Sequence, residues 1–278
     1  MVSEAWVVDM AVDMAVCGSQ CKRLSTKNRP PIAMDHPHVT RLRHLPQYEQ
    51  LSPEWFAVRK TLVTASIGAA ALGIKPFESF TGCPREASIR QTVEGTFKGS
   101  VATRHGQKYE DHVRDIFASI TGRRVYELGL IRHVDVYGPE HGLEWLGVSA
   151  DGVTDSNELV EIKAPFRRTI IPGEVPHHYW PQCQLQMECL DVPVCYFIEW
   201  QPAWLSSTGR EVINIVPVER DREWFARNKT VFHEYFLELQ HRRQTYTPPP
   251  PPKCLIRDDL YNDLETGFVE SKCLFRDD

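Results

Sequence analysis

The sequence predicts an α/β fold, in which a mixed β-sheet is flanked by helices in the chain order α-β-β-β-α-β. Two stretches with helical periodicity, residues 106–121 and 179–190, enclose three short apolar stretches, and a fourth apolar stretch follows. With 278 residues, of which 42% are hydrophobic, the chain is long enough to bury a proper core. An N-terminal helical part and a long C-terminal helix are expected to flank this core.

The chain divides by composition into three parts. Residues 1–45 are expected to be an irregular extension, because Asn28–Pro31 and Asp35–Pro37 interrupt any periodicity. Residues 46–246 are expected to form one domain, with a helical part over 46–100 and the sheet over 101–246. Residues 247–278 hold a five-proline spacer and a tail in which the motif Lys-Cys-Leu-x-Arg-Asp-Asp occurs twice. That tail either returns to the core as a strand or docks a partner.

The helical part contains a candidate anion site. Ser52 and Pro53 suit the start of a helix that ends near Arg59. Thr64-Ala65-Ser66 then opens a second helix, Ile67–Leu72, which Gly73 ends. Hydroxyls at a helix N-terminus favour an anion, and a nearby arginine adds a charge-assisted contact to phosphate. The alternative for Ser66 is plain helix capping.

The next helix, Gly106–Thr121, is amphipathic. Glu110 falls on the flank of its apolar stripe, from where a carboxylate can face a sheet. The alternative is a partly buried glutamate that stabilises the helix start. The apolar stripe consists of Tyr109, Val113, Ile116, Phe117 and Ile120.

Three strands are expected to follow, Val125–Ile131, Trp145–Ala150 and Leu159–Lys163, the last after a polar turn. Because strand side chains alternate, Glu161 and Lys163 share a face with Leu159, whereas Val160 and Ile162 take the other face. Asp151, Glu161 and Lys163 then converge, and two acids with a lysine suit a divalent cation beside a scissile phosphate. The alternative is a solvated sheet face with an ordinary Glu–Lys pair.

The last elements are a helix, Tyr179–Leu190, two strands, Val194–Trp200 and Glu211–Val218, and a helix from Asp221 to about Arg243. Gln182 and Gln186 are four residues apart and share one helix face, with Gln184 across from them. The alternative is a surface helix that is merely rich in glutamine.

Together these segments resemble the YqaJ-like viral recombinase family of phage lambda-type exonucleases, within the PD-(D/E)xK nuclease superfamily. Ala150 is one departure, since the family usually has proline before the metal-binding aspartate. The resemblance implies a restriction-endonuclease-like core, in which residues 46–100 bind the DNA end and residues 101–246 form the catalytic part. It rests on the segments Ser52–Arg59, Val63–Ser66, Gly106–Glu110, Ser149–Gly152, Glu161–Pro165 and Tyr179–Met187.

The resemblance also implies a set of site residues. Asp151, Glu161 and the carbonyl of Ile162 would hold Mg²⁺, which Mn²⁺ can replace, and Glu110 would contact a second metal or its waters. Lys163 is the expected catalytic lysine. The other implied residues are Gln182, which positions the lysine or the attacking water, its companion Gln184, and the 5′-phosphate ligands Arg59, Ser66 and Thr64. Arg167 and Arg168 lie just past the catalytic strand, where the nucleic-acid backbone would run.

The function implied by the resemblance is a 5′→3′ exonuclease that acts on linear double-stranded DNA with 5′-phosphorylated ends, in viral or phage recombination. A single-strand-annealing protein is the implied partner, and a homotrimer the implied assembly. One alternative is a related alkaline nuclease with endonuclease or RNA-cleaving activity. Another is a DNA-binding scaffold that keeps the fold but has lost cleavage.

Charge and composition limit the other possibilities. The net charge of −5 provides no global attraction for DNA, so binding needs a local basic surface. The sequence has no transmembrane run, and Glu4, Asp9 and Asp13 argue against a signal peptide, so an intracellular protein with reduced thiols is expected, in host cytoplasm or nucleus if viral. The pair Cys17 and Cys21 lacks a second pair at zinc spacing, and no cysteine-bound metal is expected.

Overall fold

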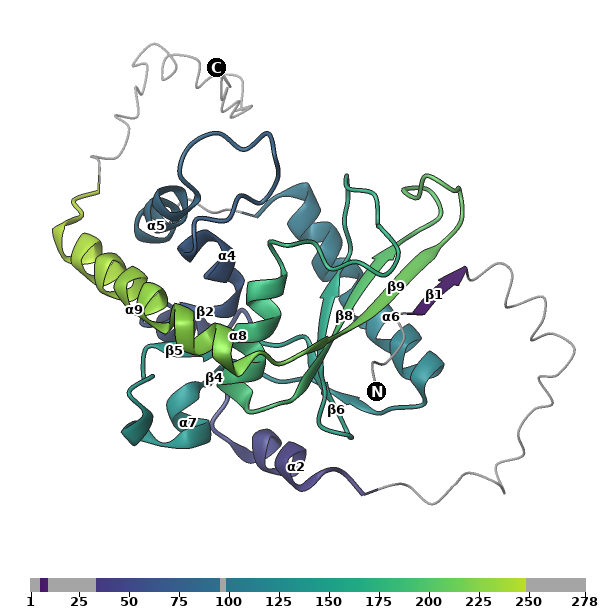
Figure 1. Cartoon of the computed structure of the whole chain (residues 1–278), viewed down its shortest axis with the longest axis horizontal. Coiled ribbons are helices and arrows are strands. Elements are labelled where there is room, and N and C mark those ends of the chain that lie inside the picture. Colours follow the sequence, from purple (N-terminus) through teal and green to yellow (C-terminus); the bar gives the residue numbers. More distant parts are fainter. Residues whose placement is uncertain (1–5, 10–33, 96–98, 249–278) are drawn as a thin grey trace, which may run out of the picture. The chain divides into compact units, whose positions relative to one another are not determined.

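A computed structural model describes residues 6–9, 34–95 and 99–248, which carry a mixed α/β fold (Figure 1). The compact unit ends at Thr245. Most of the proline run, both copies of the tail motif and the pair Cys17 and Cys21 lie outside the described residues. None of the described helices is long and apolar enough to cross a membrane.

The larger sheet has the strand order β1-β9-β8-β7-β6-β3. Strand β7 runs parallel to β8, and the other neighbouring strands are antiparallel. With helix α6 (Val101–Thr121) first and α8 (Trp180–Leu190) between β7 and β8, the chain order is the predicted α-β-β-β-α-β. The strands are β1 (Trp6–Asp9), β3 (Val125–Tyr126), β6 (Gly152–Thr154), β7 (Leu159–Lys163), β8 (Val194–Gln201) and β9 (Val212–Glu219).

The two faces of this sheet are covered by different helices (Figure 1). Val160 and Ile162 of β7 pack in one apolar cluster with Val113 and Phe117 of α6. Leu159 belongs to the other cluster, which includes the buried side chains of α8. The predicted alternation along β7 is therefore confirmed, and Glu161 lies on the α8 side of the sheet.

A second, smaller sheet has the order β2-β5-β4, formed by Val63–Thr64, Leu146–Val148 and Ile131–Arg132. Two strand predictions were therefore wrong. The expected strand Val125–Ile131 is divided between the two sheets, because the chain turns where Gly129 approaches Tyr48. Only glycine fits this approach, since a Cβ on Gly129 would lie 2.5 Å from the Tyr48 carbonyl oxygen. The expected strand Trp145–Ala150 ends at Val148 and belongs to the small sheet. Helix α7 (His133–Tyr137) and the turn η3 (Pro139–His141) lie between β4 and β5.

The small sheet positions two segments that the sequence keeps far apart. Strands β2 and β5 are parallel, with Val63 beside Leu146 and Thr64 beside Gly147. Parallel strands end at the same edge of a sheet. The segment that leads to Ser66 and the segment that leads to Ser149 therefore leave the small sheet side by side.

The N-terminal extension is not irregular where the structure describes it. Helix α2 (Pro37–His44) begins with proline at its first position, and His36 Nδ1 accepts a hydrogen bond from the His38 backbone N–H. Its residues Val39 and Leu42, three apart, are fully buried. Strand β1 pairs antiparallel with β9 at the edge of the larger sheet. This helix has only eight residues and follows a proline-rich segment, so its periodicity is not visible in the sequence.

Residues 46–95 are helical as expected, but the second helix is shorter than predicted. Helix α3 (Pro53–Arg59) has Ser52 as its N-cap, and α5 (Pro84–Glu94) ends at Gly95 in the left-handed conformation. Between them, one 3₁₀ turn, η2 (Ala65–Ile67), leads into the four residues of α4 (Gly68–Ala71). Neither η2 nor α4 has a side-chain N-cap hydrogen bond.

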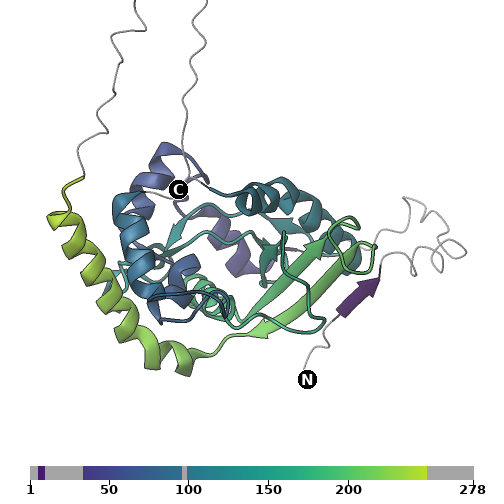
Figure 2. The ribbon, with the colours of Figure 1, turned by 90° about the horizontal axis from the view of Figure 1, so that it is seen from above.

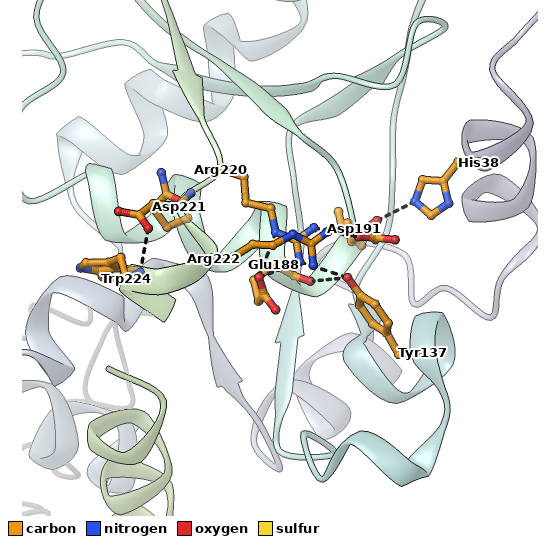
Figure 3. A network of polar contacts seen from close by, with 10 residues as sticks. His38, Tyr137, Glu188, Asp191, Arg220, Asp221, Arg222 and Trp224 are labelled. Carbon is orange, nitrogen blue, oxygen red and sulfur yellow. Dashed lines mark hydrogen bonds and ion pairs between the residues drawn. The ribbon is translucent and has the colours of Figure 1, made fainter. Parts of the chain in front are cut away.

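The long helix α9 (Arg222–Thr245), yellow-green in Figure 2, follows β9 directly. Arg220 fixes this junction (Figure 3) through ion pairs with Glu188 at 2.6 Å and Asp191 at 2.7 Å, and a hydrogen bond to the Tyr137 hydroxyl at 3.1 Å. Glu188 lies at the end of α8, and Asp191 follows it in the left-handed conformation. The Arg220 network therefore ties α7, α8 and the start of α9 together.

Candidate active site

Asp151, Glu161 and Lys163 converge where β7 ends and β6 begins. These strands are antiparallel neighbours with Gly152 opposite Val160, so the residue before β6 lies beside the end of β7. The Ile162 backbone N–H donates to Asp151 Oδ2 at 2.7 Å, and Lys163 Nζ donates to Glu161 Oε1. Asp151 lies in the short connection between β5 of the small sheet and β6 of the larger sheet.

Helix α8 holds both oxygens of the Glu161 carboxylate, whose side chain is 1% exposed. Gln182 Nε2 donates to Oε1 at 2.5 Å, and Gln186 Nε2 donates to Oε2 at 2.6 Å. Gln186 was not predicted as a site residue, although its spacing of four from Gln182 put both on one helix face. The geometry gives Glu161 a fixed orientation.

Gln184, the predicted companion of Gln182, does not lie at this site. Its Nε2 donates to the Glu219 carbonyl at 2.8 Å, and its Oε1 accepts from the Asp221 backbone N–H at 2.7 Å. Residues two apart on a helix point in different directions, so Gln184 faces the junction of β9 and α9 instead. Its prediction as a site residue is therefore at odds with the geometry.

Glu110 reaches the site from α6, as its place on the flank of the apolar stripe predicted. Its carboxylate accepts from Arg114 Nη2 at 2.9 Å, and Arg114 Nε donates to the Asp151 carbonyl at 3.1 Å. Arg114 was not predicted as a site residue, although its i,i+4 spacing from Glu110 places the two side chains on one helix face. Arg114 thereby ties Glu110 to the backbone beside Asp151.

Burial and a neighbouring negative charge raise the pKa of two carboxylates of the site, Asp151 and Glu110. Burial, followed by the charge of Glu161, raises the pKa of Asp151 well above its usual value. Burial also raises the pKa of Glu110; Arg114 opposes this, and Glu161 adds to it. Burial alone lowers the pKa of Lys163, but the charges of Glu161 and Asp151 outweigh it, so the net pKa is raised and the lysine is charged.

This donor set fits a hard divalent cation, because all its acidic groups offer oxygen and their mutual repulsion favours a positive charge. As they stand, Asp151 accepts from the Ile162 backbone, Glu161 from lysine and glutamine, and Glu110 from Arg114. Among the described residues, no group of three or more His, Cys, Asp or Glu side chains has an arrangement that could hold a metal ion.

The predicted 5′-phosphate ligands also lie together. Arg59 Nη2 donates to Ser66 Oγ at 2.9 Å, and the hydroxyls of Ser66 and Thr64 are 3.2 Å apart. The Arg59 guanidinium lies 4.6 Å from the centre of the Trp55 ring, and burial lowers its pKa. The expected helix Ile67–Leu72 is shortened to the four residues of α4 after the 3₁₀ turn η2, so the guanidinium and hydroxyls, and not a helix dipole, are the groups here that suit an anion. We call Arg59, Ser66 and Thr64 the arginine–hydroxyl pocket.

Trp55 and Ser149 connect this pocket to the carboxylates. Trp55 Nε1 donates to Ser149 Oγ at 3.0 Å, and Gln186 Nε2 also approaches the Ser149 carbonyl at 3.4 Å. Ser149 is two residues before Asp151. A continuous series of contacts thus runs from Arg59 through Trp55, Ser149 and Gln186 to Glu161.

Arg167 and Arg168 have different surroundings. Arg168 pairs with Glu199, which is fully buried, and its guanidinium lies 5.7 Å from the centre of the Tyr179 ring. Arg167 is exposed. An arginine that neutralises a buried carboxylate has a structural role whether or not it also contacts a ligand. Of the two arginines, exposed Arg167 is therefore the one whose side chain is not held by a buried carboxylate.

Residues 54–193 match the model of the YqaJ-like viral recombinase domain. The chain belongs to this family. The matched residues include α3 from Glu54 on, the arginine–hydroxyl pocket and the three residues whose side chains donate to the Glu161 carboxylate, which are Lys163, Gln182 and Gln186.

The chain is also similar to a viral protein in sequence and to a solved exonuclease in structure. Uncharacterized protein R354 of Acanthamoeba polyphaga mimivirus is 26% identical over 180 residues, which are 57% of this chain but 30% of that protein. The YqaJ-family chain thus spans less than a third of the curated relative it matches. An alkaline exonuclease (LHK-Exo) from Laribacter hongkongensis is 27% identical with a TM-score of 0.54, covering 70% of this chain and 95% of that one. Its complex with dAMP is similar, with a TM-score of 0.55.

Proposed function

We propose that this chain is a metal-dependent deoxyribonuclease that degrades one strand of linear double-stranded DNA from 5′-phosphorylated ends. The observation that carries the proposal is the convergence of Asp151, Glu161 and Lys163, with Glu161 fixed by Gln182. The similarity to an alkaline exonuclease over 95% of that enzyme's chain supports it. Cleavage from the 5′ end and the role in viral or phage recombination rest on the family resemblance.

The residues would share the reaction as follows. Asp151, Glu161 and the Ile162 carbonyl would hold Mg²⁺ or Mn²⁺, with Glu110 contacting a second ion or its waters. A divalent cation bound there would polarise the phosphate and lower the pKa of a water. The charged Lys163 amine would offset negative charge as it develops on the phosphate oxygens. Gln182 and Gln186 would hold Glu161 in one orientation through the reaction.

The first test uses end-labelled linear duplex with Mg²⁺, Mn²⁺ or EDTA. We expect cleavage with either metal and none with EDTA. Lys163→Ala should abolish hydrolysis while leaving duplex binding largely intact. Arg227→Ala, which removes an exposed charge on α9, is the matched control. Cleavage by Lys163→Ala at the wild-type rate would show that the site is wrongly assigned.

The second test concerns the end preference. Arg59→Ala should selectively slow the degradation of 5′-phosphorylated ends, because it removes the charged donor beside Ser66. An equal loss on phosphorylated and unphosphorylated ends would contradict the end-pocket role. Cleavage of closed circular DNA or RNA would favour an alkaline nuclease with endonuclease or RNase activity, and binding without cleavage would favour a silent scaffold. The trimer and the annealing partner remain predictions.

A further inference from the structure

An open cleft of about 780 Å³ adjoins the proposed active site. One wall comes from α4, α5 and the loop between them, and the other from the segment that leads into α8 (elements labelled in Figure 1). Ser66 of the arginine–hydroxyl pocket and Gln182, which contacts Glu161, both line it. The cleft therefore begins where both proposed phosphate positions lie.

The lining of the cleft is aromatic and basic. Phe77 and Phe80, on the loop between α4 and α5, pack edge to face with ring centres 5.7 Å apart, and the Phe77 side chain is 57% exposed. Tyr179 lines the opposite wall. Arg90 supplies positive charge, Arg168 is already paired with Glu199, and the described lining residues include no Asp or Glu. In a chain of net charge −5, a cleft without carboxylates is suited to a polyanion.

Nucleobases are suitable occupants for a cleft with an exposed phenylalanine, because every base has an apolar face that can stack on the ring. Single strands are commonly bound by aromatic side chains that stack on the bases beside basic groups that hold the backbone. Within a duplex, both faces of a paired base are covered by the neighbouring base pairs, so a protein ring cannot stack on it. The combination of Phe77, Phe80 and Arg90 therefore favours an unpaired nucleotide over a duplex segment.

We propose that this cleft seats the unpaired base of the 5′-terminal nucleotide, with Phe77 and Phe80 as its stacking surface. The inference rests on the proposed function: the terminal nucleotide has one phosphate at Arg59 and Ser66 and the next at Glu161 and Lys163. Its base then enters the space that adjoins both. Stacking on phenylalanine tolerates all four bases, which suits degradation without sequence preference.

The test places the fluorescent base 2-aminopurine at the 5′-terminal position of a phosphorylated duplex, bound to the Lys163→Ala variant so that the end stays intact. Binding should quench the fluorescence through stacking. Adding Phe77→Ala should restore most of the fluorescence and weaken binding about fivefold or more, the lower end of what one stacked base contributes. Phe77→Trp should retain the quenching. Trp204→Ala is the matched control, since Trp204 is 64% exposed and is not among the cleft residues.

The outcomes separate the two proposals. If wild-type protein degrades no linear duplex, or Lys163→Ala does not bind it, the proposed function fails. If duplex is degraded and bound but Phe77→Ala and Phe80→Ala leave the terminal signal unchanged, the stacking inference is overturned. Equal quenching of 2-aminopurine at an interior paired position would also overturn it, because the cleft would then hold duplex.

Discussion

Trp55 Nε1 donates a hydrogen bond to Ser149 Oγ at 3.0 Å across 94 positions of sequence, and this bond joins the arginine–hydroxyl pocket to the connection that carries Asp151. The same indole lies under the Arg59 guanidinium. Trp55 is 6% exposed, so water does not readily replace its partner. The Trp55 side chain thus contacts both Arg59, a proposed ligand of the DNA end, and the Ser149 hydroxyl, two residues before the proposed metal ligand Asp151.

Trp55→Phe should lower kcat on 5′-phosphorylated duplex about fivefold with little change in KM. Phenylalanine keeps a ring under Arg59 but removes the N–H, and a hydrogen bond of about 1 kcal/mol corresponds to that factor. Steady-state kinetics on phosphorylated ends measure it. Ser149→Ala should have the same effect, and the double variant should be no worse than either single one. Additive losses would show that the two residues act separately.

Gln186 and Gln184 should have opposite roles despite being two residues apart. Gln186→Leu leaves Glu161 Oε2 without its donor, so we expect at least a tenfold loss of kcat. Gln184→Ala removes two hydrogen bonds to the junction of β9 and α9, so we expect about 1–3 kcal/mol of destabilisation with kcat retained. Kinetics and urea denaturation of both variants distinguish the roles. A large loss of kcat in Gln184→Ala, with kcat retained in Gln186→Leu, would show that Gln184 and not Gln186 acts at the site.

The parts of the site that were predictable from sequence depend on local periodicity. Alternation along β7 placed Glu161 and Lys163 on the face opposite to Val160 and Ile162, and helical spacing placed Glu110 beside the sheet. The same spacing places Gln186 on the face of Gln182, whereas the family resemblance implied Gln184, which contacts the Glu219 carbonyl instead. Local patterns were reliable because each depends on one element.

The contacts between segments could not be predicted in this way. Strands β2 and β5 have two and three residues, too few for a period to be seen, yet their parallel pairing brings Ser66 near Ser149. The division of residues 125–131 between two sheets depends on the close approach of Gly129 to Tyr48, which is distant in sequence. Only the folded chain reveals such contacts.

Arg220→Met should lower the free energy of unfolding by about 2–3 kcal/mol, since it leaves Glu188 and Asp191 without their main partner at a place where Arg220 is only 5% exposed (Figure 3). Burial alone lowers the pKa of Arg220, but its hydrogen bonds to Asp191 and Glu188 raise it overall, so the arginine stays charged. Urea denaturation measures the change. Arg222→Ala is the matched control: Arg222 also pairs with Asp191 but is 69% exposed, and we expect a change within about 0.5 kcal/mol. Equal effects would mean that burial of the network is unimportant.

His133 should make the protein sensitive to mild acid. Its side chain is 2% exposed and stacks on Tyr137 with ring centres 4.4 Å apart, and its Nδ1 has no hydrogen-bond partner among the described residues. Burial, with smaller contributions from His141, Lys229 and Arg220, lowers its pKa from 6.5 to about 4, whereas Asp191 opposes the shift. The folded state therefore holds the neutral imidazole more firmly than the unfolded state does.

A lowered pKa in the folded state means that the unfolded chain binds the proton first. The contribution of His133 to stability is complete above pH 6.5 and is lost as the pH falls towards 4, amounting to a loss on the order of 3 kcal/mol below that pH. His133→Phe keeps the stack on Tyr137 and has no proton to bind, so its unfolding free energy should fall less steeply between pH 6.5 and 4. Urea denaturation of both proteins at several pH values measures the two slopes. Parallel slopes would show that His133 does not govern the acid response, because the remaining titrating groups are the same in both proteins.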